Sequence, residues 1–380
     1  MIVPRRQFPL ISALIFLLAT IAPALNAASP KVLQQGSPEI IVEQLADGLG
    51  IPWGMTFISA QQLLISERAG RLRLLDLKKL SLVTISGLPD IAASGQGGLM
   101  EIITGPDFIN NGWIYFSYSK ATNSGNATTL ARAKLAGTKL EQWQDLIVTD
   151  SGSDTGRHFG GRIAFDNNGH VFLGIGDRGE RDQAQNLENH QGTIIRLNLD
   201  GSVPGDNPFV SQSNARAEIW SYGHRNPQGL VYDAGNHRLW SIEHGPRGGD
   251  EINLIQKKGN YGWPVVSHGK EYWGPVSIGE GTSKPGMVDP VKVYIPSIAP
   301  GSLLLYQGDQ FPQWRGNLFA GALKLQHINR VSLSAQGRAI SEHRLLESLR
   351  RRVRHIIQSP QGDIIFSTDR GEILRLSPSP

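Results

Sequence analysis

Three segments of the chain combine glycine with side chains that could do chemistry. In the first, residues 157–162, His158 precedes the pair Gly160 and Gly161. Imidazole titrates near neutral pH, so His158 could serve as a general base, and glycines let a ligand approach the backbone closely. A single histidine among the ten of this chain is more often structural, so the segment alone leaves both interpretations open.

The second and third segments offer hydrogen-bond donors and oxygen ligands. Residues 222–229 crowd Arg225, Asn226 and Gln228 together, which suits an anionic or hydroxyl-rich ligand. The alternative is a loop whose polar side chains cap its own backbone. Residues 243–253 place carboxylates on a backbone bent by glycine and proline, and calcium takes such carboxylate and carbonyl oxygens. Their spacing does not match an EF-hand loop, so the metal signal is weak.

Cations near the C-terminus could bind an anion. If residues 350–354 run as a strand, Arg352 and Arg354 point to the same face, because side chains alternate along a strand. Two inward guanidinium groups would need a multiply charged anion to offset their burial. The usual interpretation of such a basic run is a solvated edge strand that discourages aggregation. The same two interpretations, an anion contact or a solvated surface charge, apply to Lys324.

Several enzyme classes lose support from what the sequence lacks. The chain has no cysteine, which excludes disulfides, thiolate zinc sites, iron–sulfur clusters and a cysteine nucleophile. Neither a G-x-S-x-G nor an H-E-x-x-H motif occurs, so the common serine and zinc hydrolases have little support. No G-x-G-x-x-G motif opens a helix, which argues against a nicotinamide cofactor. Any metal must be held by oxygen or imidazole.

One pattern recurs along the chain and predicts the fold. Each copy has two runs with the two-residue period of strands, joined by a turn of Asp, Asn, Gly or Gln. Six copies begin at Ile51, Gly97, Gly160, Pro227, Ala299 and Val353. Such repetition predicts an all-β, six-bladed β-propeller with four-stranded antiparallel blades, whose loops surround one central axis. The competing interpretation, a pair of β-sandwiches, would need a linker that the sequence does not show.

The first 27 residues have the pattern of a secretory signal peptide. Two arginines precede an apolar run over residues 8–21, and small residues follow, which predicts cleavage after Ala27. The run is short for a membrane span, so we expect a soluble periplasmic protein rather than an anchored one. Residues 28–380 are then a single propeller domain. Without the leader, 35 basic residues stand against 33 acidic ones, and a nucleic-acid function loses its electrostatic basis.

Taken together, these segments resemble the soluble aldose sugar dehydrogenases that depend on pyrroloquinoline quinone (PQQ), a family that includes soluble glucose dehydrogenase. The resemblance runs from about Val42 to the C-terminus. It rests on six segments in a fixed order, 94–99, 158–162, 200–209, 218–229, 244–253 and 260–264. Each is modest evidence alone, but their order inside a sixfold β repeat behind a signal peptide is specific.

The resemblance implies oxidation of an aldose at its anomeric carbon to a lactone, with PQQ and calcium as cofactors. His158 matches the base that takes the proton of the anomeric hydroxyl, and Arg225 matches the residue that touches the quinone and stabilises its reduced form. The other matched cofactor contacts are Gln96, Asn226, Gln228, Lys324, Arg352 and Arg354. The matched calcium ligands are the carbonyls of Gly245 and Pro246 at the active site, and Asp250, Glu251 and Tyr261 at a second, structural site.

The sequence departs from the family pattern in residues 294–300. Ile295 stands where glucose-specialised members carry a tryptophan, and Ser297 stands where a threonine is expected. These changes bear on substrate preference and on stacking against the quinone, and they leave the reaction class untouched. Residues 176–183 align with a loop that holds a further polar contact, but the alignment does not identify the residue.

Two other functions remain open at this stage. The first is a calcium-dependent lactonase on the same type of propeller, since a central metal can equally polarise a lactone carbonyl. The second is a non-catalytic propeller that binds a partner on its loop face. For the dehydrogenase, the expected partners are an aldose and a separate electron acceptor that the sequence does not name. Both a monomer and a homodimer are compatible with the sequence, and no membrane insertion is expected after signal cleavage.

Overall fold

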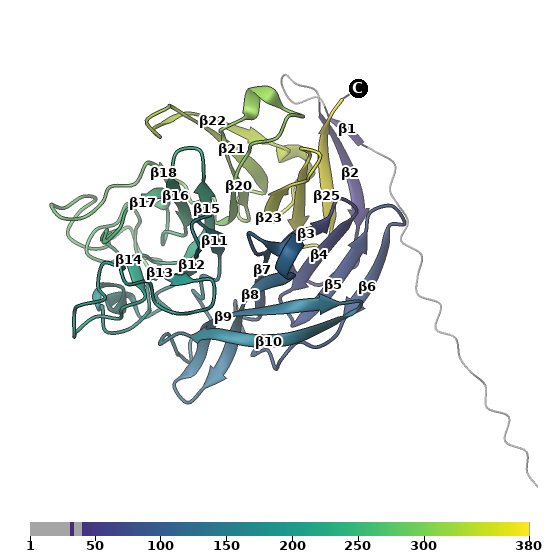
Figure 1. Ribbon diagram of the computed structural model, residues 1–380. Helices are drawn as coiled ribbons and strands as arrows, with labels where there is room; N and C mark the ends of the chain where they lie inside the picture. Colours follow the sequence, from purple (N-terminus) through teal and green to yellow (C-terminus); the bar gives the residue numbers. More distant parts are fainter. Residues whose placement is uncertain (1–30, 34–39, 380) are drawn as a thin grey trace, which may run out of the picture.

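The computed structural model describes residues 31–33 and 40–379, which form six antiparallel sheets arranged in sequence order around a common centre (Figure 1). The six-bladed propeller predicted from the repeats is therefore confirmed. The predicted signal peptide, residues 1–27, lies outside the described residues. Among the residues that the structure does describe, no helix has the length and apolarity needed to cross a bilayer.

Each blade is a sheet whose neighbouring strands follow one another along the chain. Blade 1 contains β3 (Pro52–Ser59), β4 (Gln62–Glu67), β5 (Arg71–Asp76) and β6 (Ser81–Ile85). Blade 2 contains β7 (Leu99–Thr104), β8 (Trp113–Thr122), β9 (Gly125–Ala136) and β10 (Lys139–Val148). Blade 3 contains β11 (Ile163–Phe165), β12 (His170–Ile175), β13 (Thr193–Asn198) and β14 (Ile219–Tyr222).

The second half of the ring repeats this arrangement. Blade 4 contains β15 (Pro227–Asp233), β16 (Arg238–Glu243), β17 (Asp250–Ile255) and β18 (Lys292–Tyr294). Blade 5 contains β19 (Pro300–Leu305), β20 (Leu318–Ala322), β21 (His327–Leu333) and β22 (Ala339–Leu345). The described helices are short, namely α1 (Phe108–Asn111), η1 (Arg181–Gln185), η2 (Pro312–Trp314) and η3 (Glu347–Leu349).

Blade 6 joins the two ends of the chain. It consists of β23 (Val353–Gln358), β24 (Ile364–Thr368), β25 (Ile373–Pro378) and β2 (Ile40–Ala46). Because β2 pairs with β25, the ring is closed by hydrogen bonds between residues more than 300 positions apart. A short additional strand, β1 (Lys31–Leu33), pairs with β2, so this blade has five strands rather than the four expected.

The sequence repeat corresponds to the first two strands of each blade. The six copies start within two residues of β3, β7, β15, β19 and β23, and three residues before β11. The first strands of neighbouring blades contact one another, which places them around the axis. Loops that leave these strands therefore converge on the axis from all six blades.

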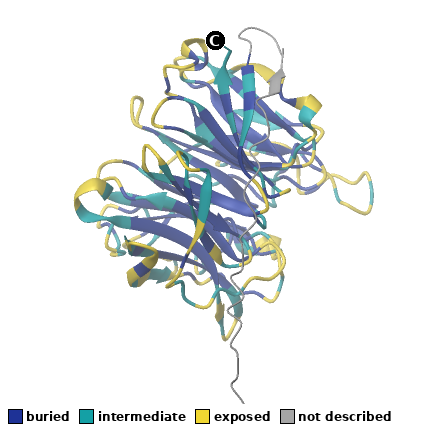
Figure 2. Cartoon of the chain, turned by 90° about the vertical axis from the view of Figure 1, so that its right-hand side faces the viewer, coloured by how far each residue is buried: buried dark blue, intermediate teal, exposed yellow. Residues whose placement is uncertain are grey.

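Hydrophobic side chains pack between neighbouring blades rather than in one central core. One cluster joins Leu64 and Leu72 of blade 1 to Ile102 and Phe116 of blade 2, and similar clusters join the later blades. Figure 2 shows the buried residues running through the strands, with exposed residues in the loops at both ends. Removing this apolar surface from water holds the blades together and so fixes the loops around the axis.

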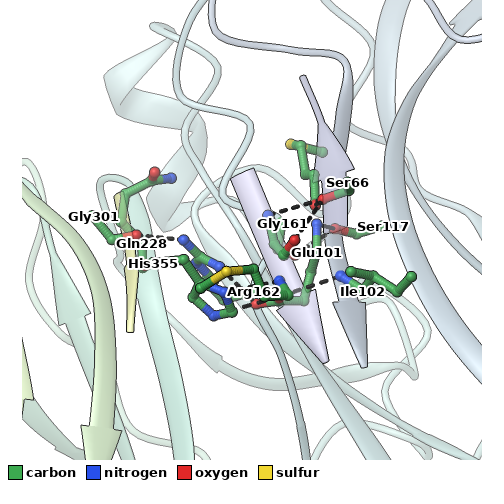
Figure 3. A network of polar contacts seen from close by, with 12 residues as sticks. Ser66, Glu101, Ile102, Ser117, Gly161, Arg162, Gln228, Gly301 and His355 are labelled. Carbon is green, nitrogen blue, oxygen red and sulfur yellow. Dashed lines mark hydrogen bonds and ion pairs between the residues drawn. The ribbon is translucent and has the colours of Figure 1, made fainter. Parts of the chain in front are cut away.

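The axis itself is closed by a buried polar group. Arg162 donates to a carboxylate oxygen of Glu101 at 2.8 Å, and also to the carbonyls of Gln228 at 2.8 Å and Gly301 at 2.5 Å. Figure 3 shows this side chain between Glu101 on one side and Gln228 and Gly301 on the other. His355 lies beside the pair and accepts a hydrogen bond from the Met55 amide at 3.0 Å, which requires its Nδ1 to be unprotonated. The hub thus ties strands of five blades together.

Candidate active site

The central feature of the site is a histidine–carboxylate pair. His158 Nδ1 lies 2.6 Å from Asp177 Oδ1. The other carboxylate oxygen of Asp177 accepts a hydrogen bond from the indole of Trp263 at 2.8 Å, and the Gly179 amide donates to Oδ1 at 2.7 Å. The Asp177 side chain is 1% exposed, whereas that of His158 is 12% exposed. With Nδ1 bound to Asp177, the second ring nitrogen is available to accept a proton from a ligand.

The backbone around His158 is held in an unusual conformation. His158 has a φ of 54°, in the left-handed region that non-glycine residues rarely adopt. Its amide donates to the side-chain oxygen of Gln96 at 2.8 Å. The carbonyl of His158 lies so close to Gly176 that a Cβ there would come within 2.0 Å of it. Only glycine at 176 lets the loop after β12, which carries Asp177, approach the histidine, so this residue makes the pair possible.

Electrostatics keep His158 neutral and Asp177 ionised. Burial is the main cause that lowers the pKa of His158 below its ordinary value of 6.5; Asp177 opposes this shift, and the nearby Arg225 and Arg157 add to it. Burial alone would raise the pKa of Asp177, but hydrogen bonding and charge interaction with His158 lower it overall. A neutral imidazole backed by a buried carboxylate is suited to general-base chemistry.

Next to this pair lies a cationic cavity of about 210 Å³. Phe159 and Gly160, which directly follow His158, form part of its wall. Its other lining residues come from five blades and their loops, namely Trp53, Arg68, Gln96, Asn226, Gln228, His244, Ala299, Leu323, Arg352 and Arg354. The structure thus brings together five of the cofactor contacts that the resemblance implies. The arrangement suits a small, polar, anionic molecule.

The two C-terminal arginines face the cavity and share one carboxylate. Asp369 accepts from Nε of Arg352 at 2.8 Å and from Nε of Arg354 at 2.9 Å. Arg68 adds a third cation, and burial together with the neighbouring Arg354 lowers its pKa. Three guanidinium groups with one carboxylate leave a net positive charge. Lys324 is exposed and is not among the residues lining the cavity.

Arg225, a predicted cofactor contact, is not among the residues lining this cavity and bonds to the loop after β16. Its guanidinium donates to the carbonyl of Gly245 at 2.9 Å and lies 5.2 Å from the centre of the Trp263 ring, while its buried Nε has no partner. Asn226 and Gln228 bond mainly to Gly160: the Gly160 amide donates to Asn226 at 3.2 Å, and Gln228 donates to the Gly160 carbonyl at 3.1 Å. These two amides therefore hold the loop after His158 as well as facing the cavity.

A second, ion-sized cavity of about 20 Å³ adjoins Arg225. Gly245, Pro246, Glu251 and Tyr261 line it, together with Glu243. Burial, and next the neighbouring Glu243, raises the pKa of Glu251 to about 8. A divalent cation would relieve this repulsion between two buried carboxylates, and oxygen atoms are the ligands that calcium prefers. In the described part of the chain, no group of three or more His, Asp or Glu side chains could hold a metal, so carbonyls would have to complete the set.

The remaining expected calcium ligands have other partners. Asp250 accepts from the Gly245 amide at 2.9 Å with one oxygen, and from the Ser297 hydroxyl at 2.5 Å with the other. The hydroxyl of Tyr261 donates to the Leu254 carbonyl at 2.7 Å, which leaves its main-chain carbonyl as the group that could face an ion. Ser297 therefore supports Asp250 from the loop in which the sequence departs from the family.

An exposed aromatic hairpin lies beside Arg225. Residues 270–277 pair with each other and with Arg247, and Glu271 forms an ion pair with Arg181 at 2.7 Å. The hydroxyl of Tyr272 lies 3.4 Å from a guanidinium nitrogen of Arg225. Ile295, which stands where a tryptophan was expected, is 70% exposed. The loop 294–300 therefore offers no aromatic ring at that position.

Sequence analysis missed several residues of the site. Asp177 was noted only as part of the loop 176–183, because nothing in its local sequence shows that the loop meets residue 158. Arg68 lies just after a strand, and nothing in the sequence distinguishes it from the nearby Arg71 and Arg73. Trp263 lies in the segment 260–264, where sequence analysis assigned no role to this residue, and its indole donates to Asp177. Each of these roles depends on which blades are neighbours in the ring, and the local sequence does not show this.

Comparisons with known proteins agree with this geometry. The family model Glucose / Sorbosone dehydrogenase matches residues 49–375. Aldose sugar dehydrogenase YliI of Escherichia coli is 39% identical over 345 residues, which cover 89% of this chain and 92% of that protein. The apo-form crystal structure of soluble aldose sugar dehydrogenase from Escherichia coli matches with a TM-score of 0.86 and 37% identity, covering 90% of this chain and 100% of that one. The PQQ-bound form of aldose sugar dehydrogenase from Streptomyces coelicolor matches with a TM-score of 0.73 and 25% identity, covering 94% and 100%.

Proposed function

Because the chain belongs to the glucose/sorbosone dehydrogenase family of sugar oxidoreductases, we propose that it oxidises aldoses at the anomeric carbon to lactones, with PQQ as cofactor and calcium at the site. The observation that carries this proposal is the position of the His158–Asp177 pair beside a cavity lined by three arginines. A proton acceptor and an anion site are the two parts that such a reaction needs from the protein.

The cavity suits PQQ because the quinone carries three carboxylates. Arg68, Arg352 and Arg354 would hold these groups, and charge-assisted bonds from guanidinium offset the desolvation of a carboxylate. Arg225 would add a contact, since its buried Nε has no partner among the described residues. When bound, the quinone would accept the hydride of the sugar, and calcium would act as a Lewis acid that makes it a better acceptor.

His158 would take the proton of the anomeric hydroxyl. As C1–H leaves with its electron pair and the O–H bond breaks, the C1–O single bond becomes the carbonyl of the lactone. The proton passes to Nε2 of His158, because Nδ1 is held by Asp177 at 2.6 Å. The imidazolium that forms is stabilised by the Asp177 carboxylate, as in other histidine–carboxylate pairs. Trp263 and Gly179 fix the carboxylate by donating to its two oxygens.

Calcium would be held by main-chain oxygens next to Arg225. Gly245 and Pro246 line the ion-sized cavity, but the Gly245 carbonyl accepts from Arg225. A cation at this carbonyl requires the guanidinium to move to another acceptor. Glu251, with its raised pKa, and Tyr261 line the same cavity and would bind this cation, because the cavity has room for a single ion.

We further propose that the protein works in the periplasm and passes its electrons to a separate acceptor. The leader pattern of residues 1–27 supports export. No covalent redox group could be carried on cysteine, since the chain has none. Each oxidation would leave two electrons on the quinone, and these would have to pass to a second molecule before the next turnover.

Reconstitution tests the function. Purified protein is mixed with PQQ and calcium, then with an aldose and a redox dye. Dye reduction that needs both cofactors and the sugar supports the dehydrogenase. Hydrolysis of a lactone without PQQ would support the lactonase instead, and neither reaction would support the binding propeller. In the same assay, His158→Ala should retain PQQ binding and lose most sugar-dependent turnover; normal turnover by this variant would disprove the assignment of the base.

A further inference from the structure

A buried arginine beside the catalytic pair has no role in the function proposed so far. Arg178 follows Asp177 in sequence, and the side chain is 0% exposed. Among the residues that the structure describes, no carboxylate lies within ion-pair distance of its guanidinium. A buried charge without a counter-charge is costly unless its hydrogen bonds are satisfied. Its position therefore calls for an explanation beyond packing.

Main-chain carbonyls take the place of a contacting carboxylate, while the charges of Asp177 and Glu180 favour the ionised guanidinium from a distance. Four hydrogen bonds of 2.5–3.1 Å run from the guanidinium to the carbonyls of Asn126, Ser151, Thr155 and Arg157. The ring of Phe159 covers the guanidinium, with its centre 3.5 Å from Cζ. Burial lowers the pKa of Arg178 to about 10, so the group remains charged at neutral pH. The flat guanidinium satisfies several acceptors at once, which lysine cannot do.

All of these partners except Asn126, which is in β9, belong to the loop that carries His158. Ser151, Thr155 and Arg157 precede the histidine, and Phe159 follows it, so Arg178 holds the loop on both sides of residue 158. The hydroxyl of Thr155 donates back to the carbonyl of Arg178, which locks the two loops to each other. Arg178 also has a left-handed φ of 54°, the same value as His158. Such conformations persist where surrounding contacts enforce them, and they cluster at functional sites.

We propose that Arg178 is a positioning residue for sugar oxidation, which holds the loop 151–159 so that His158 Nδ1 stays on Asp177 and Nε2 stays available to accept a proton. The assignment of a role in turnover rests on the function proposed above. The geometric part does not, because it concerns the position of His158 relative to Asp177 in the protein alone. A displacement of about 1 Å in a catalytic group can lower a rate about 100-fold.

The test uses Arg178→Lys and Arg178→Gln in the full chain. Both variants should bind PQQ with nearly normal affinity, because Arg352 and Arg354 belong to another blade. We expect turnover to fall about 10- to 100-fold in both variants, with little change in KM. Arg178→Lys should retain at most part of the activity that Arg178→Gln loses. In proton NMR spectra, the downfield Nδ1 proton of His158, produced by the 2.6 Å contact, should broaden or disappear in both variants.

Arg196 provides a matched control in the same blade. It is also buried, donates to Asn207 at 2.8 Å, and lies 4.4 Å from the Trp220 ring centre; unlike Arg178 it pairs with a carboxylate, that of Asp206, and it is not among the cavity residues. Arg196→Lys should lower the melting temperature without changing the His158 signal or turnover per folded molecule. If Arg178→Gln does not fold, Phe159→Leu removes only the ring and should weaken the same NMR signal.

The outcomes separate the two proposals. Unchanged turnover and an unchanged His158 signal in folded Arg178→Lys and Arg178→Gln would overturn the positioning role, whatever the wild type catalyses. If the wild type oxidises no aldose but the His158 signal still depends on Arg178, the proposed function fails and the geometric role of Arg178 stands. Loss of the signal in Arg196→Lys as well would show a general structural effect and would also overturn the proposal.

Discussion

The contact between His158 and Asp177 predicts a large effect for Asp177→Asn. The substitution keeps the size of the side chain and removes its charge. An asparagine oxygen can still accept from His158 Nδ1, but its amide group then faces the indole N–H of Trp263, which now donates to Asp177 at 2.8 Å. The imidazolium formed during oxidation therefore loses its counter-charge, and the supporting hydrogen bond from Trp263 is lost.

The size of the effect follows from the bond that is weakened. A hydrogen bond to a charged group contributes about 1.5–3 kcal/mol, which corresponds to a fall in turnover of roughly 10- to 150-fold. The pH profile should shift as well. Because Asp177 raises the pKa of His158 against the effect of burial, its loss lowers that pKa further. The acid limb of kcat/KM should move to lower pH while its plateau falls.

The assay is steady-state dye reduction by enzyme loaded with PQQ and calcium, measured from pH 4 to 8. Asp166→Asn is the matched control, because His170 Nδ1 lies 2.6 Å from Asp166 in the same blade and neither residue lines the cavity. This control should leave turnover unchanged. Turnover within twofold of wild type for Asp177→Asn, with an unmoved acid limb, would refute the reasoning.

Three further predictions follow from the site and the hub. Arg354→Ala should weaken PQQ binding roughly 10- to 150-fold by fluorescence titration, through loss of a charge-assisted bond; equal affinity would contradict the anion site. A calcium chelator should lower the melting temperature of Glu251→Gln less than that of the wild type. An equal decrease in both proteins would show that the ion binds elsewhere. His355 has a pKa well below 6.5, mainly because of burial, with the nearby Arg162 adding to the shift, and it faces the Glu101 carboxylate at 3.7 Å. As pH falls below 6.5, the unfolded chain takes up a proton on this histidine and the folded protein does not. Urea unfolding should therefore show that this histidine costs about 2 kcal/mol of stability between pH 6.5 and 5. The stability of His355→Asn should depend less steeply on pH.

The sequence was sufficient to predict the propeller because the information is repeated. Each blade begins with the same pair of strands, so six weak signals support one another, and the structure places those pairs as β3–β4 through β23–β24. The pairing of β2 with β25 could not be predicted in this way. It joins residues from opposite ends of the chain, and nothing in either strand identifies its partner.

The site was predicted in part for a similar reason. Motifs that are continuous in sequence, such as those around His158 and Arg225, could be recognised from their residues. Asp177 and Arg68 act through neighbours 19 or more residues away, so their roles depend on the geometry of the ring. Lys324 shows the opposite case, since its place in a motif did not put it in the cavity lining.

The closure of blade 6 has a consequence for how the chain is made. Since β2 emerges early and β25 last, the circle of sheets stays open throughout synthesis, and the edge of β2 that pairs with β25 stays uncovered until this final strand arrives. Contacts of such long sequence separation form slowly. A chain that stops before β25 keeps an exposed strand able to pair with another copy, so loss of a few C-terminal residues should favour aggregation over a stable five-bladed fragment.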